Sequence, residues 1–167
     1  MDSKEKLAMS LDYIFGKNVS KALPLEKLEF TYSKKTGRIR TVTLNGKLLA
    51  TMRSDGSIAP TLYGATLLIQ QPEFQENCIV AQEGPDQFVA EGRSLFAKHV
   101  VKCGDRIKPE ADVAILNVKG EVIAVGKAIL SAKMMRSFKA GAAVKVREAI
   151  GKQGEVEAEA AEEEEEE

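Results

Sequence analysis

Hydrophobic and polar positions follow two different periods in the first half of the chain. Residues 4–15 have apolar positions at helical spacing, which predicts an amphipathic helix that ends at a glycine. Residues 28–53 alternate between apolar and polar positions, which predicts short strands. Asn45-Gly46 separates two of these runs, and this dipeptide is the strongest short-range signal for a β-hairpin. After Pro60 the helical spacing returns, so residues 1–75 are predicted to form a helix, a curled antiparallel sheet and a second helix.

The second half of the chain has short apolar runs with turn signals between them. Pro85 follows a first predicted strand and is expected to open a helix that continues to Ala97. Gly92 lies inside that helix, where glycine costs about 1 kcal/mol relative to alanine, so it indicates a break or a close approach of another backbone. Four more strands follow, and Gly126 within one of them predicts a bulge or a barrel corner. Residues 77–150 are therefore predicted to form a small β-barrel, which protects its strand edges by closing.

The expected fold class is α+β, with an N-terminal antiparallel sheet and helices followed by the C-terminal barrel. A chain of 167 residues has room for two small domains. No apolar run approaches the roughly 18 residues that a membrane span needs, and the charged N-terminus does not have the pattern of a secretory signal. We therefore expect a cytoplasmic protein without membrane contact.

The charge of the chain is divided unevenly. The formal net charge is −1, but residues 155–167 hold nine glutamates and no basic residue. The rest of the chain has 24 basic against 16 acidic residues, a net charge of about +8. A net positive charge outside residues 155–167 is typical of a protein that binds nucleic-acid phosphates, because each phosphate that it neutralises releases counterions and so favours binding. Residues 151–167 are expected to be a disordered acidic tail, because like charges repel and the segment has too little apolar surface to bury.

No catalytic or metal-binding pattern is present in the sequence. A single histidine excludes a histidine-rich metal site, and the two cysteines, Cys78 and Cys103, lack zinc or redox spacing and are expected to be reduced thiols. The chain has no phosphate-binding loop of the G-x-x-x-x-G-K type, and one histidine does not support a Ser-His-Asp or Cys-His arrangement. The sequence therefore predicts a protein without catalytic activity, metal or cofactor.

Several stretches resemble known RNA-binding modules. In the second half, EGRSLFAKHV, GEVIAVGKAILSAKMM and KAGAAVKVRE resemble the PUA domain, which occurs in RNA-modifying enzymes and some translation factors. In the first half, LDYIFGKNVSKAL, YSKKTGRIR and LNGKLLATMRSDG resemble the domain that precedes PUA in archaeosine tRNA-guanine transglycosylases. The last of these stretches, continued through SIAPTL, also resembles translation factors of the density-regulated type. The resemblance implies a pre-PUA domain in residues 1–75 and a PUA RNA-binding domain in residues 77–150. The transglycosylase reaction needs an aspartate in a (β/α) barrel of about 250 residues, for which this chain has no room.

The PUA resemblance also implies an RNA surface, formed by the first helix of the domain, the turn after it and the last strand. Carried onto this sequence, the RNA-binding residues are Gly92, Arg93, Phe96, Lys98, His99, Lys102, Lys145 and Arg147. The lysines and Arg147 would supply charge, and Arg93 could make forked contacts to phosphate. Bases of single-stranded RNA stack on aromatic side chains or arginine, and His99 could stack or donate. Many PUA domains have Pro-Gly in the turn after the helix, where this chain has Lys98-His99 and thus an added cation instead of a close backbone contact.

Alternatives to these assignments stay open. Lys145 and Arg147 alternate with valines, as they would in any half-buried strand. Phe96 is expected to face the core rather than RNA, since apolar residues on a helix usually face inward. Residues 34–40 form a second basic cluster, which either binds RNA or is a solvated hairpin. Further basic residues near a predicted helical turn are expected to be solvent-exposed; they are Lys133, Arg136 and Lys139.

The sequence thus predicts a non-catalytic protein that binds tRNA or another structured RNA, with a role as accessory to an RNA-modifying enzyme. Two other functions stay open. The first is a translation factor that binds rRNA on a ribosomal subunit, and the second is a protein-interaction module whose basic face meets an acidic partner. The acidic tail either keeps the protein soluble or folds over the basic face and competes with RNA.

Overall fold

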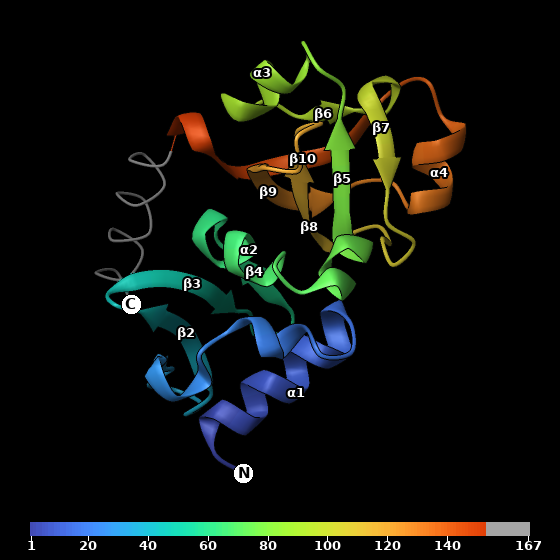
Figure 1. Ribbon diagram of the computed structural model, residues 1–167. Helices are drawn as coiled ribbons and strands as arrows, with labels where there is room; N and C mark the ends of the chain where they lie inside the picture. Colours follow the sequence, from blue (N-terminus) through green and yellow to red (C-terminus); the bar gives the residue numbers. More distant parts are fainter. Residues whose placement is uncertain (153–167) are drawn as a thin grey trace.

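The chain folds into two parts that lie one above the other in the computed structural model, which describes residues 1–152 (Figure 1). The first part begins with helix α1 (Ser3–Phe15) and ends with helix α2 (Leu62–Leu68). Asp2 caps α1, because its side chain accepts a hydrogen bond at 2.8 Å from the backbone N–H of Glu5. Both helices form where the apolar spacing predicts them.

A four-stranded antiparallel sheet lies between these helices in the sequence. Its strands, in order across the sheet, are β1 (Glu29–Tyr32), β2 (Ile39–Leu44), β3 (Lys47–Met52) and β4 (Ile58–Pro60). Two short 3₁₀ helices, η1 (Val19–Ala22) and η2 (Leu25–Lys27), connect α1 to β1. Asn45 and Gly46 have φ angles of 53° and 80°, the positive values that a two-residue hairpin turn requires. The predicted hairpin at this dipeptide is confirmed.

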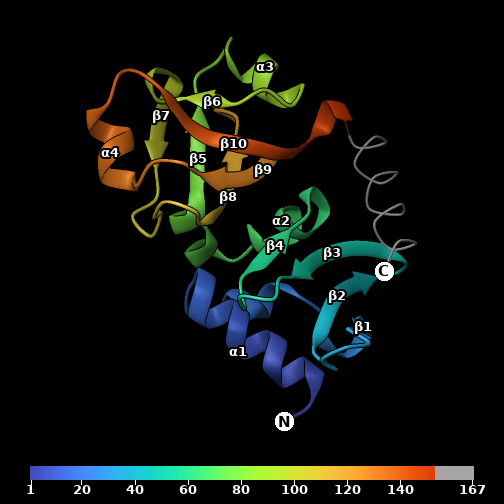
Figure 2. The same ribbon diagram turned by 180° about the vertical axis from the view of Figure 1, so that it is seen from behind.

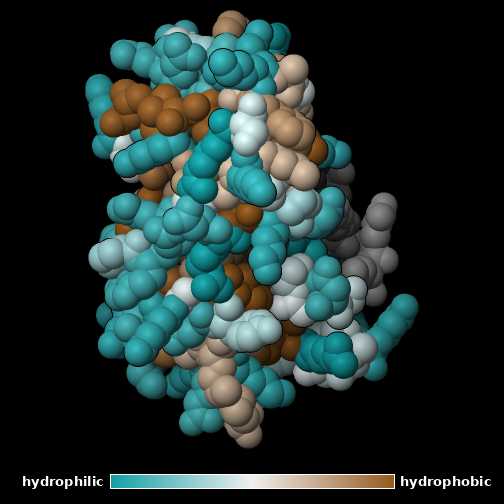
Figure 3. Space-filling view, turned by 90° about the vertical axis from the view of Figure 1, so that its right-hand side faces the viewer, coloured by the Kyte–Doolittle hydropathy of each residue, from teal (hydrophilic) through white to brown (hydrophobic). Residues whose placement is uncertain are grey.

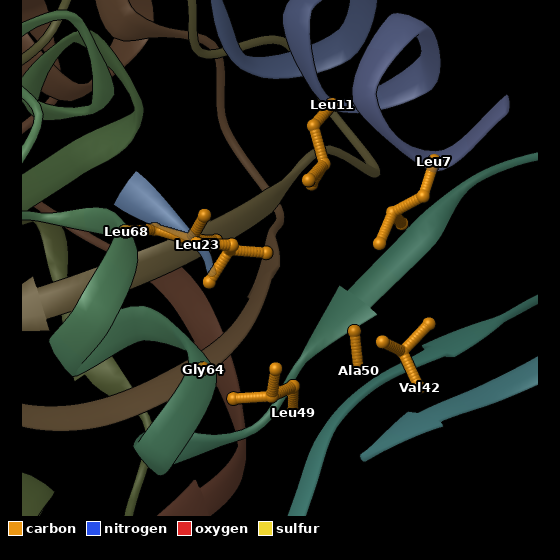
Figure 4. Close-up of a pocket in the computed structure, with 8 residues that line it drawn as sticks. All are labelled: Leu7, Leu11, Leu23, Val42, Leu49, Ala50, Gly64 and Leu68. Atoms are coloured by element: carbon orange, nitrogen blue, oxygen red, sulfur yellow. The ribbon is translucent and has the colours of Figure 1, made fainter. Parts of the chain in front are cut away.

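The core of the first part forms where α1 and α2 pack against β2 and β3 (Figure 4). Leu7 and Leu11 of α1 point toward the sheet, and with Val42 and other apolar side chains they surround a gap of about 10 Å³. Its apolar lining offers a water molecule almost no hydrogen-bond partners. Gly64 lets α2 approach β3, since a Cβ at this position would lie 2.0 Å from the carbonyl oxygen of Leu49. The tight packing of this core therefore depends on a glycine in the helix.

The second part is a nearly closed six-stranded barrel. Its strands are β5 (Cys78–Ala81), β6 (Leu95–Phe96), β7 (Val100–Cys103), β8 (Asp112–Leu116), β9 (Val122–Ala128) and β10 (Ala142–Ala149), in the order β6-β10-β9-β8-β5-β7. Strands β5 and β8 are parallel, and the other neighbours are antiparallel. The edge strands β6 and β7 are joined by a 3₁₀ helix, η4 (Ala97–His99). The predicted α+β fold with a C-terminal barrel is confirmed.

Two helices accompany the barrel, α3 (Asp86–Ala90) and α4 (Ala132–Ser137). The prediction of a helix that continues from Pro85 to Ala97 is wrong. The backbone turns at Gly92, whose φ is 101°, and Leu95 and Phe96 form β6 instead. A φ of this sign is unfavourable for a residue with a Cβ, so the glycine that weakened the predicted helix is the residue that ends it.

The predicted bulge beside Gly126 is confirmed. This glycine lies opposite Val146 in the β9–β10 pair, and the register of β10 shifts between Val146 and Glu148. A Cβ on Gly126 would lie 2.1 Å from the carbonyl oxygen of Lys145, so the two strands can approach here only because the side chain is absent. Such a bulge bends the strand and re-aims the side chain within it, which here is Arg147.

The two parts of the molecule share one apolar cluster. Cys78, Leu116 and Val125 of the barrel belong to the same cluster as the buried residues of α1 and α2. The link between the parts is a 3₁₀ helix, η3 (Pro72–Asn77), with Phe74 and Asn77 buried. Its Phe74 is 1% exposed and packs edge to face against a phenylalanine of α1, with ring centroids 5.4 Å apart.

The end of α1 is also held by one residue of the link and one of the barrel. Asn77 donates a hydrogen bond from Nδ2 to the carbonyl oxygen of Phe15 at 2.6 Å. Arg106 donates from Nη2 to the carbonyl oxygens of Tyr13 and Ile14 at 3.0 and 3.1 Å. The last carbonyls of a helix lack partners within the helix, so these contacts stabilise α1 and fix it to the barrel.

The described part of the chain ends with a 3₁₀ helix, η5 (Ile150–Lys152), which lies beside α3 in both ribbon views (Figures 1 and 2). The predicted acidic tail begins at residue 151, but residues 153–167 lie outside the described residues. Within residues 1–152, no helix has the length and apolar character that crossing a membrane requires. The same residues contain no group of three or more His, Cys, Asp or Glu that could hold a metal ion.

Candidate nucleic-acid interface

The turn after α3 places an arginine over an exposed aromatic ring. The Cζ atom of Arg93 lies 5.4 Å from the ring centroid of Phe88. The backbone N–H of Arg93 donates to the carbonyl oxygen of Phe88 at 3.0 Å, and the phenylalanine is 53% exposed. A guanidinium over an aromatic face contributes about 0.5–1 kcal/mol at an exposed site. The stack therefore holds a cation and a flat apolar surface together at the surface of the barrel.

Sequence reasoning missed Phe88. Residues five positions apart do not share a helix face, so a helix continuing from Pro85 to Ala97 would separate Phe88 from Arg93. They meet because the chain turns at Gly92, where the N–H bonds to the carbonyl oxygen of Val89 at 2.9 Å. The signal that could have found Phe88 is the glycine itself, read as the end of the helix.

The strand and turn that follow carry three more of the predicted residues. Phe96 is 47% exposed and pairs with Ala142 of β10, so the expectation that it faces the core is wrong, because it lies in a strand and not in a helix. Lys98 in η4 is exposed. His99 is half-buried; its Nδ1 lies 3.3 Å from Oε1 of Gln82, and its carbonyl oxygen accepts from the Gln82 N–H at 2.8 Å. These contacts give His99 a role in positioning the turn.

On β10, Lys145 is exposed and lies directly opposite Lys127 of β9. The Nζ atom of Lys127 is 3.7 Å from a carboxylate oxygen of Glu110, a pair that is itself largely exposed. Like charges opposite each other on a sheet are destabilising, and an anion bound near them would relieve the repulsion. Strand β10 pairs with β6, and α3 packs against β10. We use the name α3–β10 surface for five exposed residues on or beside these elements, namely Phe88, Arg93, Phe96, Lys98 and Lys145.

Arg147 contacts a buried carboxylate instead of joining this surface. Its Nη1 lies 3.0 Å from Oδ1 of Asp112, and its Nη2 donates to the carbonyl oxygen of Pro60 at 2.7 Å. Because the bulge of β10 falls at this residue, its side chain does not continue the row that Lys145 begins. These contacts count against the RNA role expected for Arg147.

Asp112 binds a second arginine from the first part of the molecule. The Nη1 and Nη2 atoms of Arg53 lie 2.6 and 2.9 Å from the two carboxylate oxygens of Asp112, a bidentate arrangement. The Asp112 side chain is 4% exposed. The hydrogen bond to Asp112 raises the pKa of Arg53 above its ordinary value. Arg53, Asp112 and Arg147 thus form a charged clamp between the two parts, with one carboxylate between two guanidinium groups.

Lys102 lies on a different surface, a groove between the two parts. The groove has a volume of about 550 Å³, and residues of η3, β5, β7 and the β8–β9 turn contribute to its lining. Lys102 pairs with Val80, and both line the groove with Gln70 and Asn117. Cys78 and Cys103 also line it, and both are free thiols, as predicted. Burial raises the pKa of Cys78 to about 12.

The remaining basic clusters lie apart from the α3–β10 surface. Lys133, Arg136 and Lys139, in and after α4, are exposed as predicted, and Arg136 pairs with Asp105 at 2.5 Å. The face that carries α4 and β7 is largely hydrophilic with some apolar areas over the barrel (Figure 3). The basic turn between β1 and β2 lies at the opposite end of the molecule from α3 (Figures 1 and 2).

Comparison with known proteins assigns both parts. Residues 5–74 match the patch-forming domain C2 of tRNA-guanine transglycosylase, and residues 78–150 match the PUA domain. Residues 5–74 therefore correspond to a C2 domain and residues 78–150 to a PUA domain. The resemblance seen in the sequence is thereby confirmed, and α3, β6, η4 and β10 all belong to the PUA domain.

Relatives of known name match the chain over most of its length. The tRNA-guanine(15) transglycosylase of Pyrococcus abyssi is 38% identical over 140 residues, which cover 83% of this chain and 24% of the enzyme. The enzyme of the same name from Methanocaldococcus jannaschii is 34% identical over 144 residues, 85% of this chain and 22% of the enzyme. The chain therefore spans about a quarter of the length of these relatives.

Solved structures share the arrangement of the two domains. A hypothetical protein from Pyrococcus horikoshii superposes with a TM-score of 0.71 at 24% identity, covering 94% of this chain and 96% of that one. A PUA domain protein from Thermoplasma acidophilum gives a TM-score of 0.65 at 22% identity with the same coverage. At these identities the likeness shows the fold alone, which is shared over nearly the whole length of each chain.

Proposed function

We propose that this chain is a non-catalytic RNA-binding protein that holds tRNA, or another structured RNA, on the α3–β10 surface of its PUA domain. The stack of Arg93 on Phe88 carries the proposal. An exposed ring offers a stacking platform for an unpaired base, and the guanidinium beside it offers a fork for phosphate. Lys98 and Lys145 add cations on neighbouring elements, in a chain whose first 154 residues have a net charge of about +8.

The relatives favour tRNA over other RNAs. Two of them are named for a reaction on tRNA, and they resemble this chain only in about a quarter of their length. That quarter corresponds to the C2 and PUA domains, and it does not include a (β/α) barrel of about 250 residues. We propose that the protein holds tRNA as an accessory to a separate RNA-modifying enzyme.

Crosslinking followed by sequencing of the bound RNA tests the proposal. The full chain is irradiated with total cellular RNA, beside a variant with Arg93→Ala and Lys98→Ala and a control with Lys34→Ala and Lys35→Ala. The control removes the same charge from the β1–β2 turn. We expect tRNA reads that fall at least tenfold in the first variant and are retained in the control. Ribosomal RNA in place of tRNA would point to a translation factor. A protein partner that remains bound after nuclease treatment, without any RNA reads, would overturn RNA binding.

A further inference from the structure

The groove between the two domains, with a volume of about 550 Å³, has an apolar floor on the face of the barrel that is turned toward the C2 domain. Val80 of β5 lies between Leu116 of β8 and Lys102 of β7, its partners in the two neighbouring strands. Val80 and Leu116 also belong to the apolar cluster that the barrel shares with the C2 domain. The floor is therefore two apolar side chains side by side, with a cation at one edge.

The end of the C2 domain and the link supply the opposite wall. Gln70 follows α2, and Gln75 and Glu76 belong to η3; all three line the groove. Gly104 lets the barrel approach the link, because a Cβ at this position would lie 2.2 Å from the carbonyl oxygen of Glu76. The backbone N–H of Asp105 also donates to Oε2 of Glu76 at 2.8 Å. The two walls thus hold each other in place, and the groove is a fixed feature of the domain arrangement.

Several polar groups of the groove are available to a ligand. Within residues 1–152, the exposed side chains of Lys102, Gln70 and Gln75 make no hydrogen bond or ion pair. The Oδ1 atom of Asn117 accepts from two backbone N–H groups of the β8–β9 turn at 3.0 Å each, which orients its Nδ2 group. Sites for small molecules have volumes of about 300–1,000 Å³, a largely apolar lining and a few polar groups that fix orientation. The groove has all three properties.

We propose that this groove binds one nucleotide, with its base on Val80 and Leu116 and its phosphate at Lys102. A base outside a helix packs on apolar side chains and is recognised by hydrogen bonds to its edges. An amide side chain offers a donor and an acceptor side by side, which matches the edge of a base. Gln70 supplies such a group from the C2 side, and Asn117 adds a donor from the barrel side. Both domains therefore contribute to recognition of the base.

The inference rests on the proposed function for the source of the nucleotide, an unpaired residue of the bound RNA. Lys98 of the α3–β10 surface lies four residues before Lys102, and four residues of extended chain span about 13 Å. One RNA can therefore contact both sites with only a few nucleotides between them. A free nucleotide has the same chemistry, and the experiment distinguishes the two sources.

The test records amide chemical shifts of the full chain while each of the four ribonucleoside 5′-monophosphates is added at millimolar concentration, with ribose 5-phosphate as the control ligand. We expect shifts at residues 69–70, 102–104 and 116–120 with at least one nucleotide and much smaller shifts with ribose 5-phosphate. Lys102→Ala and Gln70→Leu should each weaken nucleotide binding roughly three- to tenfold, since each removes a hydrogen-bonding group. Lys139→Ala removes an exposed lysine that does not line the groove and should leave binding unchanged. Equal shifts with ribose 5-phosphate would mean that no base is recognised and would overturn the inference.

The same amides are then followed while tRNA is added to the protein with the nucleotide bound. Displacement of the nucleotide, together with shifts at residues 86–98, would show that RNA supplies the occupant of the groove. Shifts at residues 86–98 with no shift in the groove, from either tRNA or any nucleotide, would overturn the inference and leave the proposed function standing. Nucleotide binding in the groove of a protein that does not bind tRNA would overturn the proposed function and assign the groove to a free nucleotide.

Discussion

Arg93 and Arg147 are two arginines of the PUA domain that the family resemblance assigns to RNA, and the structure gives them different partners. Arg93 lies on the ring of Phe88, at an exposed turn with its hydrogen-bonding fork near solvent. Arg147 binds a carboxylate that is 4% exposed and a backbone carbonyl of the C2 domain. A guanidinium that turned from Asp112 to a phosphate would leave that carboxylate with one partner fewer. The contacts that an arginine side chain makes, more than its residue type, therefore decide whether it can reach RNA or instead joins the two domains.

The two contacts also differ in how much stability depends on them. A stack at an exposed site contributes about 0.5–1 kcal/mol, and it survives alongside a bound phosphate. Removing one partner of a buried charged pair costs several kcal/mol, because a buried charge is left without compensation. Substitutions in the clamp should thus affect folding first, and substitutions on the α3–β10 surface should affect binding alone.

The largest effect is expected from Asp112→Ala. It leaves Arg53 and Arg147 facing each other without the carboxylate between them, and because both guanidinium groups keep some solvent contact, the free energy of unfolding should fall by about 3 kcal/mol, the lower end of the range for buried pairs. Urea denaturation measures this fall. The matched control is Asp105→Ala, which breaks the exposed pair with Arg136 and should cost less than about 1 kcal/mol. Equal losses in the two variants would contradict the importance given to the clamp.

The next largest effect is expected from Arg147→Ala. The substitution removes one hydrogen bond to Asp112 and one to the carbonyl oxygen of Pro60. One hydrogen bond to a charged group contributes about 1.5–3 kcal/mol. Thermal unfolding should show a clear drop in Tm, while the affinity of the remaining folded protein for RNA should stay within about twofold of the parent. An unchanged Tm with a loss of RNA binding would return Arg147 to the RNA surface.

Much of the fold could be predicted because turn residues and apolar spacing in the sequence agree with the pattern of buried positions in the structure. The hairpin at Asn45-Gly46 needs only a two-residue turn, and the helix of residues 4–15 needs only its apolar spacing. Gly126 marks a close approach of two strands, and the sequence shows this because glycine in a strand interior has no other advantage. These features depend on neighbours in the sequence or on a single contact.

The candidate site could be predicted less well, because it depends on where the chain turns. Phe88 was missed and Phe96 was placed in the core for the same reason, namely the assumption that the helix continues past Gly92. Arg147 was grouped with Lys145 by the PUA resemblance, and no sequence signal shows that the bulge of β10 falls at this residue. Its partner Asp112 is 35 residues away in the sequence, and no local pattern reports that contact.

A smaller effect, confined to binding, is expected from Phe88→Ala. Loss of a stacked base costs about 1–3 kcal/mol, so affinity for tRNA should fall by roughly five- to a hundredfold with no large change in Tm. Fluorescence anisotropy with labelled tRNA measures this. Tyr13→Ala is the control, since that ring is 86% exposed and lies in the C2 domain. If both variants bind like the parent, the base does not stack on Phe88.

The smallest effect, and the one that separates the two arginine environments most directly, concerns the salt dependence of binding. Lys145→Ala should reduce the slope of log affinity against log salt by about one unit, as expected for the loss of one phosphate contact. If strand alternation alone placed side chains on the RNA surface, adding Arg147→Ala would reduce the slope by about one unit more. The clamp predicts no further change in slope, because Arg147 would contact no phosphate.

The measurement compares the slopes for tRNA binding by the parent, the two single variants and the double variant. All four proteins are measured at one temperature below the lowest of their Tm values. A change of about two units in the double variant would show that the clamp opens when RNA binds.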